Sequence, residues 1–101
     1  MKTEIIIPKN DNDGSDNGAL IETTIASMCS LYGGATVYAA QGYWSNEAGR
    51  LFRDDVAVIV SAATDKAAAQ KELRALARDI LNATDQEAVF LSVGGDAEII
   101  E

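Results

Sequence analysis

Three groups of residues in this chain have side chains that could bind a ligand, a metal ion or a partner. They are the acids Asp11, Asp13 and Asp16 of a polar loop, the aromatic residues Tyr38, Tyr43 and Trp44, and the adjacent pair Arg53 and Asp54. Carboxylates can hold hard cations, aromatic rings offer large contact areas, and guanidinium groups bind carboxylates. These residues are therefore the candidate binding residues of the chain.

The acidic loop resembles a calcium-binding loop in part. Asp11, Asp13 and Ser15 take positions 1, 3 and 5 of a twelve-residue loop that would end at Glu22. Position 6, where such loops need glycine, is Asp16, and no helical pattern precedes the loop. We therefore expect a solvated turn and no metal site, with weak divalent binding as the alternative.

The aromatic cluster has two interpretations. Tyr38 and Trp44 would lie on the same face of one strand, because side chains alternate along a strand. Such rings can pack in the core, or they can form an exposed patch for a partner or a second subunit. The adjacent Asp54 and Asp55 would point to opposite faces, so they cannot act as a paired acid and base.

Many catalytic chemistries lack their usual residues here. The chain has no histidine, and Cys29 is its only cysteine, which argues against zinc, iron–sulfur and histidine-dependent acid–base sites and against an internal disulfide. The apolar periodicity around Cys29 predicts a buried, inert thiol. No nucleophile elbow, phosphate loop or dinucleotide motif is present. We expect no cofactor and no enzymatic activity.

The charge is strongly negative and unevenly distributed. Sixteen acidic and eight basic residues give a net charge of −8. Lys71, Arg74 and Arg78 have the spacing of one helix face. The overall charge argues against direct binding to nucleic acid or anionic membranes. No apolar run is long enough to span a membrane or to act as a secretory signal, so a cytoplasmic location is expected.

The pattern of apolar residues predicts the elements that position these groups. Strands are expected at residues 3–7, 35–44, 55–63 and 87–93, and helices at residues 19–32 and 66–82. Residues 33–55 should form a hairpin, with Gly33 and Gly34 ending the first helix and SNEAG as the turn. The Leu73, Leu76 and Ile80 stripe should pack on the sheet.

This order predicts one α+β domain over residues 1–101. A βαββαβ chain most simply forms a ferredoxin-like plait, with a four-stranded antiparallel sheet in the order 4-1-3-2 and both helices on one face. The other face of the sheet would be open.

Three segments resemble an uncharacterised family of small single-domain proteins from bacteria, archaea and mobile elements. They are IIIPKNDNDG, LYGGATVYAAQGYWSNEAGRLFRDD and QEAVFLSVGGDAEII. The residues that match the family pattern are Pro8, Asp13-Gly14, Gly33-Gly34-Ala35-Thr36, Gly42-Tyr43-Trp44, Gly49 and Asp54. The resemblance implies a ferredoxin-like fold and no particular activity.

Together these features predict a small acidic, non-catalytic protein that binds another macromolecule. In its most specific form it would be a phage or mobile-element inhibitor of a host defence system. One alternative is a dimeric plait that binds a small ligand or performs simple chemistry in a sheet-face cavity, and another is a structural dimer without a ligand. We expect a homodimer joined through the open sheet face near Tyr38 or Trp44, because an apolar face of that size needs a cover.

Overall fold

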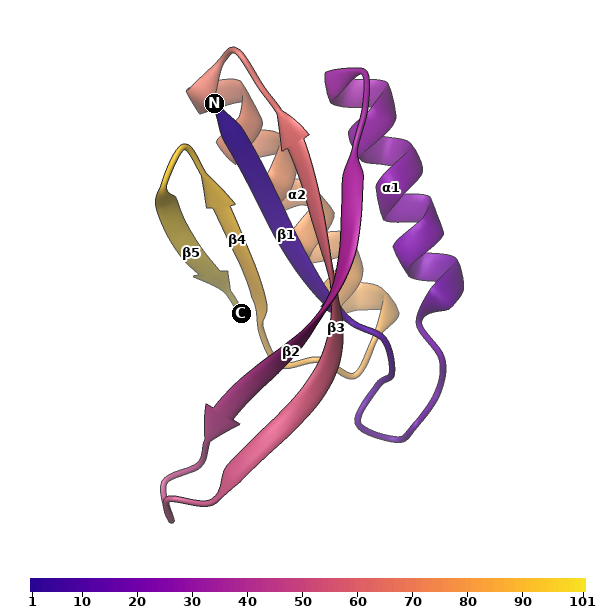
Figure 1. The fold of residues 1–101 in the computed structure, drawn as a ribbon, viewed down its shortest axis with the longest axis vertical. Coiled ribbons are helices and arrows are strands. Elements are labelled where there is room, and N and C mark those ends of the chain that lie inside the picture. The colour runs from indigo at the N-terminus through magenta and orange to yellow at the C-terminus, as the bar shows by residue number, and fades with distance from the viewer.

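A five-stranded antiparallel sheet with two helices forms this α+β protein (Figure 1). The computed structural model describes residues 1–101. The elements are β1 (Lys2–Pro8), α1 (Gly18–Tyr32), β2 (Thr36–Ser45), β3 (Leu51–Ala62), α2 (Lys66–Ala83), β4 (Val89–Val93) and β5 (Asp96–Ile100). The strands lie in the order β2-β3-β1-β4-β5.

The predicted four-stranded ferredoxin-like plait is wrong, because the C-terminal tail forms a further strand. β5 pairs with β4 from Val89 opposite Ile100 to Val93 opposite Asp96. Gly94 and Gly95 have φ values of 58° and 87°, the left-handed pair that a tight two-residue hairpin needs. The diglycine therefore turns the chain back along β4, so that the residues expected to be a short tail after the last strand form β5 instead.

One core lies between the sheet and the helices. In β1, Ile5 and Ile7 are fully buried on the helix side, and Ile59 of the central strand β3 joins them. α2 adds Leu73 and Ile80 to the same cluster. The predicted burial of these two helix residues is confirmed, and the apolar alternation of β1 explains why one of its faces must be covered.

The helix ends follow local signals. The Asp65 side chain accepts a hydrogen bond from the backbone N–H of Ala68, at 3.1 Å, and caps α2. α1 ends at Gly33, whose φ of 85° is left-handed and whose N–H donates to the Cys29 carbonyl at 2.8 Å. Cys29 itself is exposed, so its predicted burial is wrong.

The β2–β3 hairpin extends well past the other strands and forms an arm, residues 41–55 (Figure 1). The prediction of a hairpin here is confirmed. The turn is held by the Asn46 side chain, which accepts hydrogen bonds from the N–H groups of Ala48 and Arg50, each at 3.0 Å. Across the arm, the rings of Trp44 and Phe52 stack with centroids 4.3 Å apart.

Neither helix combines the length and the apolar character that crossing a membrane requires.

Replacing Leu73 by alanine should lower the free energy of unfolding by about 2 to 5 kcal/mol, because the side chain is fully buried against the sheet. Urea denaturation followed by circular dichroism measures the change. Leu31→Ala is the control, since Leu31 is 43% exposed. Equal midpoints for the two variants would contradict this packing.

Candidate functional site

The residues that the sequence predicted as binding candidates lie in several separate parts of the structure. Tyr43 and Trp44 lie on the exposed arm, and Asp11 and Asp13 lie in the loop after β1. Arg53 and Asp54 line a small polar pocket at the base of the arm, together with Asp11. Asp16 and Tyr38 line a different, more apolar pocket. The eight candidates therefore do not form one site.

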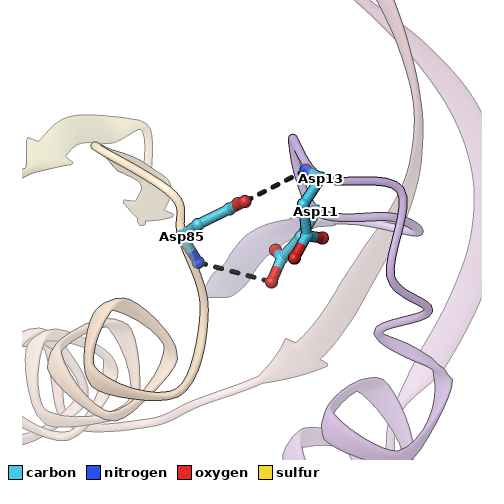
Figure 2. Close-up of side chains that lie close together, drawn as sticks. All are labelled: Asp11, Asp13 and Asp85. Atoms are coloured by element: carbon cyan, nitrogen blue, oxygen red, sulfur yellow. Dashed lines mark hydrogen bonds between the residues drawn. The ribbon is translucent and has the colours of Figure 1, made fainter.

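Asp11, Asp13 and Asp85 place one carboxylate oxygen each within 4.8 Å of the others (Figure 2). Asp85 follows α2 and accepts hydrogen bonds from the backbone N–H groups of Asn12, at 2.9 Å, and Asp13, at 3.1 Å. The Asp85 N–H in turn donates to Asp11 at 3.3 Å. These bonds tie the loop after β1 to the segment after α2, so the cluster has a structural role.

Hydrogen bonds keep the two loop acids ionised. Burial acts to raise the pKa of Asp11, but bonds donated by the side chains of Asn17 and Gln86 and by a backbone N–H outweigh it, so this pKa is lowered. The Ser15 hydroxyl and N–H lower the pKa of Asp13 in the same way. The acids whose spacing resembles a calcium-binding loop thus accept hydrogen bonds from other residues of the same loop.

An apolar slot lies between α1 and β2, with a volume of about 440 Å³. α1 packs mainly on β3 and leaves the helix-side face of the edge strand β2 uncovered. As a result Val37 is 41% exposed although it points to the helix layer. The apolar side chains that face the slot are Ile21, Ile25, Val37, Ala39 and Ala57, and Tyr38 borders it from β2 with its side chain on the other face of the sheet.

Three charged residues also line this slot: Lys9, Asp16 and Glu22. None of them takes part in an ion pair. Asp16 accepts a hydrogen bond from the Gly18 N–H at 2.9 Å, which orients its carboxylate at the start of α1. The sequence analysis named Asp16 but missed Lys9 and Glu22, because only the packing of α1 beside β2 brings them together.

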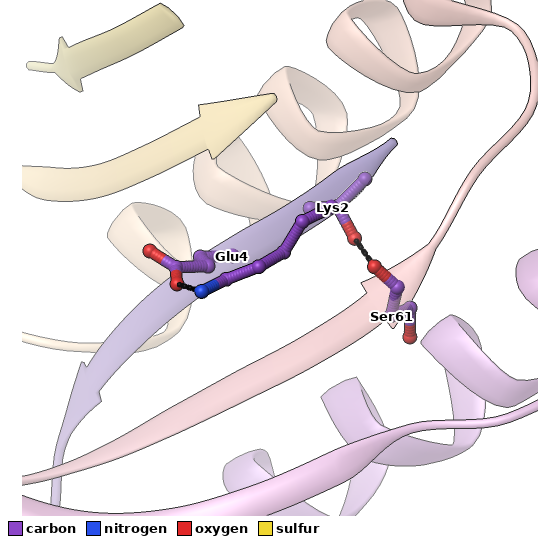
Figure 3. A network of polar contacts seen from close by, with 4 residues as sticks. Lys2, Glu4 and Ser61 are labelled. Carbon is purple, nitrogen blue, oxygen red and sulfur yellow. Dashed lines mark hydrogen bonds and ion pairs between the residues drawn. The ribbon is translucent and has the colours of Figure 1, made fainter. Parts of the chain in front are cut away.

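A larger pocket of about 600 Å³ lies where α1 turns into β2, beside Gly33 and Gly34. Its lining includes Lys2 but no carboxylate. Lys2 forms an ion pair with Glu4 at 2.8 Å (Figure 3), and this hydrogen bond and charge raise the pKa of Lys2. Below the strand surface, the Thr3 hydroxyl donates to the Ser61 carbonyl at 3.1 Å.

Tyr32, at the end of α1, also lines the larger pocket. Its hydroxyl donates to Glu72 of α2 at 3.1 Å. Burial, with this hydrogen bond and the charge of Glu72, raises the pKa of Tyr32 above its usual value. Tyr32 therefore joins the two helices as a neutral donor and offers no acid–base chemistry near neutral pH.

The sequence of residues 23–97 matches the model of a family described as protein of unknown function (DUF3574). The chain belongs to this DUF3574 family. The expected membership of an uncharacterised family is confirmed at that level. The matched segment contains Ile25 and the apolar residues of β2, and it begins one position after Glu22. Among curated proteins, no sequence matches this DUF3574 chain.

Two solved structures share the fold of this DUF3574 protein. A phage SAM lyase in complex with S-methyl-5′-thioadenosine has a TM-score of 0.72 and 19% identity, covering 98% of this chain and 87% of that one. A phage SAM lyase in the apo state has a TM-score of 0.69 and 19% identity, with 98% and 86% covered.

These neighbours overturn the expectations of a non-catalytic interaction protein and of a chain that is not an enzyme. The fold that this chain shares over nearly its whole length is that of a lyase. The inference from missing motifs failed because the absence of histidine and of known motifs excludes only the chemistries that need them.

Replacing Asp85 by alanine should lower the melting temperature by a few degrees, because it leaves the N–H groups of Asn12 and Asp13 without their acceptor. Asp79→Ala is the control, since Asp79 is an exposed acid of α2 outside the cluster. Thermal unfolding at neutral pH compares the two variants. An equal effect of both substitutions would show that the tie adds nothing to stability.

Proposed function

We propose that this protein is a lyase that cleaves S-adenosylmethionine and releases S-methyl-5′-thioadenosine, with the slot between α1 and β2 as its substrate site. The similarity in fold to phage SAM lyases supports the class of reaction. The charges that line the slot support the substrate and carry the assignment of the site.

The slot has the complementary set of charges for this substrate. S-adenosylmethionine carries two positive groups, a sulfonium and an ammonium, and one negative carboxylate. The slot offers two carboxylates, Asp16 and Glu22, and one ammonium, Lys9, and all three are free of ion pairs. Unlike charges placed near one another at a partly desolvated site favour binding.

The walls of the slot suit the adenosine part. Ile25 and Val37 are apolar surfaces for a flat base, and the volume falls within the usual range for small-molecule sites. β2 is an edge strand, so its outer side offers unpaired backbone N–H and C=O groups beside the slot. Such groups can bind the polar edge of adenine.

Two further pockets each lack one half of this combination. The pocket at Gly33 and Gly34 has cationic lining from Lys2 and no acid to receive the sulfonium or the ammonium. The polar pocket at Arg53 and Asp54 has no apolar residue in its lining, so it cannot bury a base. Of these three pockets, the slot combines apolar walls with charges of both signs.

The reaction can proceed without a protein acid or base. The carboxylate oxygen of the substrate attacks its own γ-carbon, the bond from that carbon to sulfur breaks, and the bonding pair leaves on sulfur. The products are S-methyl-5′-thioadenosine and homoserine lactone, and no proton is transferred. This path fits a chain that has no histidine.

The apolar slot would accelerate this step by removing water. The carboxylate and the sulfonium neutralise one another as the reaction proceeds, so the transition state is less charged than the substrate. Walls such as Ile25 and Val37 therefore favour the transition state over the separated charges. Glu22 holds the ammonium, whose charge does not change, and Lys9 orients the attacking carboxylate.

Incubation of the purified protein with S-adenosylmethionine should release S-methyl-5′-thioadenosine and homoserine lactone faster than a protein-free blank, as measured by liquid chromatography and mass spectrometry. Glu22→Gln should lower kcat/KM by about tenfold, because it removes one charged partner of the substrate. Glu47→Gln, at the exposed turn of the arm, is the matched control and should leave kcat/KM unchanged.

Decarboxylated S-adenosylmethionine tests the chemical path. It keeps the sulfonium and the adenosine but lacks the nucleophile, so it should bind and release no thioadenosine product. A rate equal to the blank with the natural substrate would overturn the proposed function. Full activity of Glu22→Gln would instead remove the slot as the site and leave the lyase activity standing.

A further inference from the structure

We propose that copies of this chain associate through the open face, meaning the side of the sheet opposite the helices together with the same side of the arm. This proposal does not depend on whether the slot binds S-adenosylmethionine. It rests on the alternation of side chains in the sheet, on the exposed apolar area and on the distribution of charge.

The strand register places an apolar stripe, interrupted on β3 by Asp54, on the open face. Since Ile5, Ile7 and Ile59 face the helices, their neighbours in each strand face the other way. The register carries the stripe along β2 and β3 from the body of the sheet into the arm. Its members are Tyr38, Ala40, Gly42, Trp44, Phe52, Val56, Val58 and Val60, with Ile6, Phe90 and Ile99 on the neighbouring strands.

The two ends of this stripe are accessible to solvent, whereas Val56 and Val58 at its centre are each only 6% exposed. Tyr38 is 48% exposed, Trp44 51% and Ile99 58%. Half-exposed aromatic side chains present roughly 100 Å² each. The whole chain exposes 5913 Å², whereas a monomer of this mass would expose about 5,500 Å². The chain thus exposes slightly more surface than an average monomer of its mass, and exposed apolar side chains gathered on one face are typical of an association site.

The distribution of charge indicates that the partner on the open face is a second copy of this chain. The chain carries a net charge of −8, so two copies repel each other over most of their surfaces. The carboxylates of β5 point away from the open face, because Asp96 pairs with Lys66 at 2.6 Å and Glu98 with Arg74 at 2.8 Å.

In the body of the sheet the open face carries one cation and one anion, Lys2 and Glu4, which pair at 2.8 Å (Figure 3). On the arm, Asp54 and Arg50, whose guanidinium lies 4.9 Å from the centre of the Phe52 ring, add one charge of each sign. Two copies can therefore meet on this face without net repulsion, and a two-fold arrangement lets Lys2 of each copy reach Glu4 of the other. A strongly basic partner would find few acids here.

Adjacent residues of the arm provide a matched test. Trp44 lies on the open face, and Tyr43 points to the opposite side of the same strand with 59% of its surface exposed. Trp44→Glu should weaken self-association at least tenfold, and Tyr43→Glu should leave it unchanged. Sedimentation from low to high micromolar concentration measures both, and circular dichroism checks that the variants are folded.

The wild-type protein should sediment with a mass above 10.7 kDa that falls toward that value on dilution. Ile99→Glu, at the far edge of the open face, should weaken association as well, and it replaces Trp44→Glu as the test if that variant does not fold. A wild-type mass of 10.7 kDa at every concentration would overturn the proposal. Dissociation by Tyr43→Glu and not by the open-face variants would overturn it too.

Discussion

The pairing of β3 with both of its neighbours determines most of this structure. β3 pairs with β1 over residues 56–62 and with β2 over residues 51–60. Where β1 stops, the remaining part of β3 has only β2 beside it, and the two leave the body as an arm. The same pairing makes β2 an edge strand, and α1, which packs on β3, does not cover it. The arm and the slot are two consequences of one long central strand.

The acidic residues divide into two kinds of role. Asp11 and Asp85 accept hydrogen bonds that hold two distant loops together, and Asp13 accepts hydrogen bonds from Ser15 within its own loop. Asp16 and Glu22 border the slot without ion-pair partners. The negative charge of the chain therefore serves partly to hold its loops together and partly to line a region suited to a cationic ligand.

The proposed reaction requires few catalytic side chains from the protein. A substrate that contains its own nucleophile and its own leaving group needs orientation and removal of water more than it needs a catalytic side chain. Apolar residues such as Ile25 and Val37 are then as important as Lys9 and Glu22. Residues of this kind cannot be distinguished from core residues in a sequence, so a search for catalytic motifs cannot detect a site of the proposed type.

Local patterns in the sequence determined the elements whose signals are local. The 3.6-residue period of α2, the glycine at the end of α1 and the turn residues of the 33–55 hairpin each depend on neighbours in the chain, and the structure has all three. Only the tertiary structure decided the rest. Glu22 and Val37 line one slot because α1 lies beside an edge strand. Asp85 accepts a hydrogen bond from Asn12 across 73 positions of the chain, and Cys29 is exposed because α1 buries few of its residues. The fifth strand depended on both levels: Gly94 and Gly95 allowed the turn, but the free edge of β4 gave the tail a partner with which to pair.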